Sequence, residues 1–112
     1  MPVLSVYTVV DWGLVLFAKG ANNLMPTISL FYGITIRMYW KDTDRHKEPH
    51  MHAYYSGYEA VFDFDGNILS GEFPKKQAAL VKAWSILHEE DLIANWQLAL
   101  YGEETFRIDP LR

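Results

Sequence analysis

The sequence predicts an α+β fold: an antiparallel meander of about four strands, covered on one face by a long amphipathic C-terminal helix. Alternating apolar and polar side chains predict strands between residues 34 and 73. The adjacent Asp65 and Gly66 predict a hairpin turn within them. Apolar residues at intervals of three to five predict a helix over 75–101. A sheet with one apolar face needs a cover, and this helix can supply it.

The first predicted strand spans 34–41, because Ile34, Ile36, Met38 and Trp40 alternate with polar or amphipathic residues. A polar loop over 42–49 follows. Three further strands are predicted over 51–56, 58–64 and 68–73, with a turn at Gly57 between the first two.

The predicted helix over 75–101 is longer than is usual in globular proteins, so we expect a bend near residues 88–91. There the acidic residues Glu89, Glu90 and Asp91 interrupt the apolar spacing. Gly102 is a natural stop, and a short final strand is predicted over 105–108 before Pro110.

Composition restricts the class of protein. A chain of 112 residues, 50% of them hydrophobic, fits one globular domain. Without cysteine it can form neither disulfides nor thiolate zinc sites, and a reducing cytoplasm is permitted. The net charge of −4 disfavours bulk electrostatic binding to nucleic acid. From Gly57 onward we count five basic and ten acidic residues, so an anionic ligand would favour the other half of the chain.

Two segments are predicted: an apolar N-terminal extension over 1–24 and a single domain over 25–112. No basic residue precedes Lys19, and Asp11 divides the apolar run, so the extension resembles neither a signal peptide nor a membrane span. An edge strand, a partner-binding segment and translation from an upstream start all remain open. Met25 looks like a natural beginning, which favours the last. We therefore expect neither export nor a membrane anchor.

Two histidines, His50 and His52, are the strongest chemical clue. Pro49 biases the chain before it towards extended geometry, and a Tyr-rich run follows, which favours a strand. On a strand the two histidines share one face, with their Cα atoms roughly 6 to 7 Å apart. We expect that face to be exposed to solvent, so that replacing either histidine by alanine would leave the fold intact. It would also carry Arg37, Tyr39 and Lys41, with Tyr54, Glu59 and Asp63 if the strand registers agree.

Three chemistries fit this face. In the first, His50 and His52 bind a divalent transition metal, with a third ligand from Asp42, Asp44, His46, Glu48, Glu59 or Asp63. In the second, the histidines act as acid and base on RNA, Arg37 and Lys41 stabilise phosphate charge, and Tyr39 stacks or donates a hydrogen bond. In the third, the surface binds a partner without catalysis. Whether the chain is an enzyme stays open.

Several stretches together resemble the domain of unknown function family DUF4160: residues 25–34, 38–39, 48–53, 71–74, 80–81, 84, 87–89, 92, 95–96 and 108–111. Both His50 and His52 match the histidine pair of the family. That pair usually follows two prolines and brackets an aromatic residue, whereas this chain has Glu48 before Pro49 and Met51 between the histidines. The family pattern usually starts at the equivalent of Met25.

The resemblance implies a small prokaryotic cytoplasmic protein. Members are often encoded beside another small domain of unknown function, in an arrangement that looks like a toxin–antitoxin module. It therefore implies a small partner protein encoded nearby, but it establishes no reaction, metal or target.

Overall fold

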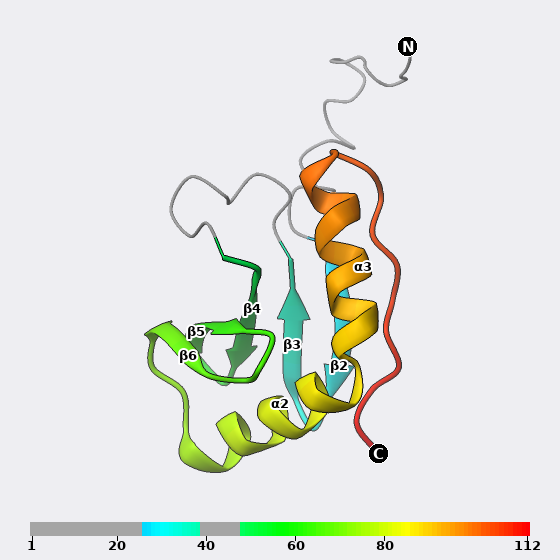
Figure 1. Cartoon of the computed structure of the whole chain (residues 1–112). Coiled ribbons are helices and arrows are strands. Elements are labelled where there is room, and N and C mark those ends of the chain that lie inside the picture. Colours follow the sequence, from blue (N-terminus) through cyan, green and yellow to red (C-terminus); the bar gives the residue numbers. More distant parts are fainter. Residues whose placement is uncertain (1–25, 39–47) are drawn as a thin grey trace.

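The computed structural model, described for residues 26–38 and 48–112, has the α+β fold that the sequence predicts (Figure 1). Five strands form one sheet in the order β2-β3-β4-β5-β6, and every pair of neighbours is antiparallel. The strands are β2 (Thr27–Phe31), β3 (Ile34–Arg37), β4 (His50–Tyr55), β5 (Tyr58–Asp63) and β6 (Ile68–Gly71). The predicted meander is therefore confirmed, with one strand more than expected.

The additional strand is β2, which the sequence pattern did not reveal. A bulge between Thr27 and Ser29 breaks its pairing with β3, so both Ile28 and Ser29 are buried and apolar residues do not alternate with polar ones. The turn to β3 starts at Tyr32, which has a φ of 50° although tyrosine is not a typical turn residue. The strand therefore lacks the usual alternation, and in its turn only Gly33, with a φ of 78°, is a usual turn residue.

Two helices, α2 (Lys75–Leu87) and α3 (Glu89–Leu100), replace the single long helix of the prediction. The expected bend is a complete break at His88, whose φ of −122° is not helical. Both helices use this residue: its N–H donates to the carbonyl of Trp84, and its own carbonyl accepts from Leu92. Three carboxylates in the first turn of α3 favour a new helix here, because they complement the positive end of its dipole.

The helices cover one face of the sheet (Figure 1). The core between the layers is built around Trp84, which is fully buried and whose ring lies 5.2 Å from that of Phe31. Sheet residues in the same cluster include Ile36, Met51 and Phe62, and Leu92 and Trp96 contribute from α3. In the described part of the chain, no helix is long and apolar enough to cross a membrane.

The final strand predicted over 105–108 is not formed. This segment runs beside β2 and α3 without regular strand structure, in the red part of Figure 1. It is held by the N–H of Ile108, which donates to the carbonyl of Ile28 at 2.7 Å, and by Ser29 Oγ, which donates to the carbonyl of Ile108. The side-chain amide of Asn95 also bonds both the N–H and the carbonyl of Phe106. Side chains thus provide much of the bonding that a sheet ladder would otherwise supply.

Candidate functional site

The candidate site lies on three adjacent strands, β3, β4 and β5. Arg37 pairs directly with His52, and Tyr54 pairs with Glu59. These residues alternate along their strands with Ile36, Ala53 and Ala60, which belong to the core cluster. We call Arg37, His52, Tyr54 and Glu59 the polar sheet face. The registers therefore unite these four residues as the sequence predicted.

The two histidines are both buried, with 1% of His50 and 8% of His52 exposed. The expectation that they lie on a solvent-exposed face was therefore wrong. His50 is the first residue of β4, and its ring packs edge-on against Trp96 of α3, with the ring centroids 5.0 Å apart. Its Nδ1 lies 3.0 Å from the carbonyl oxygen of Glu48. A residue at a strand end can thus contact the helical layer, which strand periodicity alone does not reveal.

The histidine rings lie 5.5 Å apart, with an angle of 64° between their planes. Trp96, His50 and His52 therefore form a continuous series of ring contacts from α3 to the middle of β4. Trp96 is the site residue that the sequence did not place beside the histidines. Its helical spacing indicated a core position, but nothing in the sequence connects it with residue 50.

Charged and aromatic groups surround His52 on the polar sheet face. Its Nδ1 lies 4.0 Å from Oε2 of Glu59, whose side chain is 57% exposed. The guanidinium of Arg37 lies 5.8 Å from the centroid of the Tyr54 ring, within the usual range of a cation–π contact. The face thus presents a cation on an aromatic ring beside an imidazole and a carboxylate.

A metal site requires a third ligand besides His50 and His52. Across residues 26–38 and 48–112, no group of three or more His, Asp or Glu side chains is placed to hold a metal ion. Asp63 pairs with His50 across the strands, but its Oδ1 accepts the N–H groups of Asp65 and Asn67 in the following turn. The Oε2 atom of Glu59 lies 4.0 Å from Nδ1 of His52.

Other predicted site residues fall outside the described residues. These are the catalytic candidates Tyr39 and Lys41, and the candidate metal ligands Asp42, Asp44 and His46. The metal hypothesis and the roles of Tyr39 and Lys41 stay predictions. Of the catalytic candidates, the structure brings together Arg37, His50 and His52.

Comparison with protein-family models identifies the family of this chain. A family model described as a domain of unknown function (DUF4160) matches residues 33–97, more than half of the chain. The matched region runs from the turn before β3 into α3, so it includes the polar sheet face and Trp96. No curated protein and no solved structure matches this sequence.

Proposed function

The chain belongs to the DUF4160 family, a domain of unknown function, and from that premise we propose that it is a non-catalytic, cytoplasmic binding module. Its partner is a small protein encoded beside it, in a two-gene unit of the toxin–antitoxin type. One observation carries the proposal: the two imidazoles that would perform chemistry are buried, whereas Glu59 is exposed and Arg37 and Tyr54 are half-buried. The accessible groups suit recognition better than proton transfer.

The composition of the polar sheet face favours a protein as the ligand. Arginine and tyrosine are enriched in interface cores and among the residues that contribute most to binding. Arg37 and Glu59 carry opposite charges on either side of β4, so a partner surface that offers both charges complements them better than a polyanion does. Because all four residues lie on paired strands, little order has to be gained on binding.

The two histidines then have a supporting role. His50 fills the space between Trp96 and His52. His52 lies between Arg37 on one neighbouring strand and the carboxylate of Glu59 on the other, and it fixes the spacing of these two charges.

Isothermal titration of the co-encoded protein into this chain tests the proposal. We expect Arg37→Ala and Tyr54→Ala each to weaken binding at least about tenfold, because each truncates half of the cation–π pair. Lys75→Ala is the matched control, because Lys75 is an exposed cation at the start of α2. Wild-type affinity in both polar-face variants would reject the proposal.

A second candidate, RNA cleavage, rests on the geometry of His52. A carboxylate beside Nδ1 can hold an imidazole in the orientation that leaves Nε2 to act as a base, and Arg37 lies directly across the strand where it could bind phosphate. Incubation with labelled single-stranded RNA, with and without divalent cations, tests this candidate. Cleavage that is lost in His52→Gln while the variant stays folded would favour it. If the RNA stays intact both with and without divalent cations, RNA cleavage is rejected as a function.

A further inference from the structure

The outer side of α3 carries an exposed apolar stripe that the polar sheet face does not explain. Ile93 is 42% exposed, Leu100 50% and Tyr101 81%. Ile93 and Leu100 are two helical turns apart and therefore lie on the same side of α3, with the exposed Gln97 between them. We call Ile93, Gln97, Leu100 and Tyr101 the α3 stripe. Burying these side chains would remove a substantial apolar area from water.

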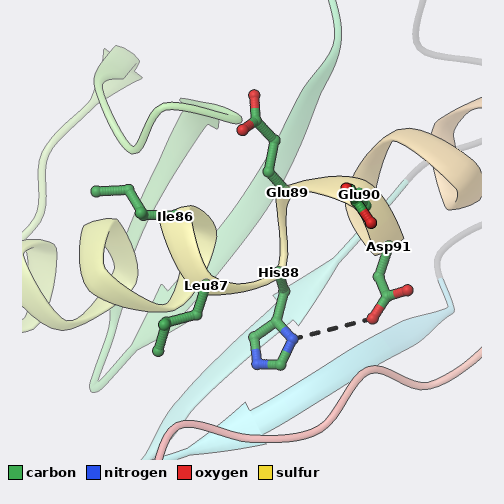
Figure 2. A pocket seen from close by; sticks show the side chains of 6 residues that line it. All are labelled: Ile86, Leu87, His88, Glu89, Glu90 and Asp91. Atoms are coloured by element: carbon green, nitrogen blue, oxygen red, sulfur yellow. Dashed lines mark ion pairs between the residues drawn. The ribbon is translucent and has the colours of Figure 1, made fainter.

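Further apolar surface adjoins the start of α3. Ile86 is 61% exposed and Leu87 67% exposed at the end of α2. Figure 2 shows these residues beside an open hollow, which His88 and the three carboxylates that begin α3 also line. Nδ1 of His88 lies 3.9 Å from Oδ2 of Asp91. The stripe therefore starts next to a surface that is both apolar and acidic.

Negative charge flanks the α3 stripe at both ends, and the first cation that follows it in the chain is Arg107. Residues 83–106 contain no lysine or arginine but five carboxylates, at Glu89, Glu90, Asp91, Glu103 and Glu104. The first three stabilise the start of α3 through its dipole. Glu103 and Glu104 follow its C-terminal end, where negative charge is unfavourable for the helix. Helix stability accounts for only one of the two acidic groups.

We propose that the α3 stripe docks a basic amphipathic helix of a partner protein. Apolar side chains of that helix would cover Ile93, Leu100 and Tyr101, and its lysines or arginines would meet the carboxylates beyond each end. A second copy of this chain fits poorly, because pairing α3 with itself brings carboxylates against carboxylates. Nucleic acids and anionic membranes are repelled for the same reason.

The spacing of the charges sets the size of this ligand. Glu90 lies in the first turn of α3 and Glu103 lies just beyond its end at Leu100. The 12 residues of α3 span roughly 18 Å. A partner helix of about four turns, apolar at i, i+4 and i+7, can reach both acidic ends. The surface lies in the helical layer and shares no residue with the polar sheet face, so the two proposals stand independently.

The test uses the full chain and a designed, fluorescein-labelled helical peptide with an apolar leucine face and lysines at both ends. We expect fluorescence anisotropy to show binding that weakens as salt rises. Ile93→Ser and Leu100→Ser should each weaken it at least about tenfold. Leu30→Ser is the matched control, because Leu30 is 53% exposed but lies in β2 and should leave binding unchanged. Circular dichroism melts establish that the variants fold, and Glu90→Lys provides a second test through charge.

Several outcomes would overturn the proposal. These are no binding by the wild-type chain, equal binding of a peptide with glutamates in place of the lysines, and equal losses in Leu30→Ser and Leu100→Ser. A dimer that Leu100→Ser dissolves would show that the occupant is a second copy instead. The Arg37→Ala variant should bind the peptide with wild-type affinity. A negative result in this test would therefore leave the proposed function of the polar sheet face unaffected.

Discussion

At the residue scale, the histidine pair shows what a sequence pattern can and cannot reveal. Strand periodicity placed His52 with Arg37 and Tyr54 on one face, and the registers confirm that grouping. The pattern wrongly predicted that His50 is exposed to solvent. The ring of His50 is covered by Trp96, a residue 46 positions further along the chain. Alternation along a strand depends only on residues adjacent in the sequence, so it cannot predict a tertiary contact at the end of the strand.

His50→Ala tests the structural role of this histidine. The substitution leaves a void beside Trp96 and removes the contact of Nδ1 with the carbonyl of Glu48, so we expect it to lower the free energy of unfolding by about 2–4 kcal/mol. Leu87→Ala, at a position that is 67% exposed, should change it by less than about 0.5 kcal/mol. Urea denaturation followed by tryptophan fluorescence measures both. Equal stability of His50→Ala and wild type would show that the packing contributes little.

Asn95 offers a second test at this scale. Its fully buried amide donates to the carbonyl of Phe106 at 2.8 Å and accepts the N–H of the same residue at 2.9 Å. Asn95→Asp keeps the acceptor but loses the donor, and it buries a charge when ionised, so we expect a loss of about 2–3 kcal/mol or more at neutral pH. Gln97→Glu, on the exposed side of the same helix, is the control. A loss no greater than that of the control would contradict the proposed bonding.

At the element scale, the sequence predicted the strands with clear alternation and missed those without it. The β4 and β5 strands appear within one residue of their expected ends, because alternation and turn residues agree there. The β2 strand was missed because its bulge places Ile28 and Ser29 both inside. The single predicted helix became two at His88, where the acidic residues had indicated only a bend.

The hairpin between β5 and β6 gives a prediction at this scale. A Cβ on Gly66 would lie 2.6 Å from the Cα of Lys82, whereas a Cβ on Gly57 meets nothing within 4 Å. Both glycines have similar φ values, +86° and +88°, so alanine has the same backbone cost at each. We expect Gly66→Ala to be the more destabilising variant by about 1–3 kcal/mol, because the turn must move away from α2. Equal melting temperatures for the two variants would indicate that the hairpin does not pack on the helix in solution.

At the scale of the whole molecule, composition and periodicity sufficed for the two-layer α+β arrangement. An apolar sheet face and an amphipathic helical segment have one simple way to bury their surfaces. The chemistry of the site was less predictable, because it depends on strand registers and on contacts between layers. The structure places Arg37 and both histidines, whereas Tyr39 and Lys41 lie outside the described residues.

Metal content provides a prediction for the complete protein. If the polar sheet face serves recognition alone, as proposed, protein purified without a histidine tag should carry less than about a tenth of an equivalent of transition metal. Inductively coupled plasma mass spectrometry of freshly purified protein, before and after incubation with zinc, measures it. One retained equivalent that is lost in His52→Ala would support the metal hypothesis and contradict a purely recognition-based role.

We propose that the polar sheet face binds the co-encoded partner. Nuclear magnetic resonance tests it most directly, through ¹⁵N-labelled chain titrated with that unlabelled protein. We expect the largest chemical-shift changes at Arg37, Tyr54 and Glu59, because these are the accessible groups of the face. Changes absent from β3, β4 and β5, or confined to α3, would contradict it.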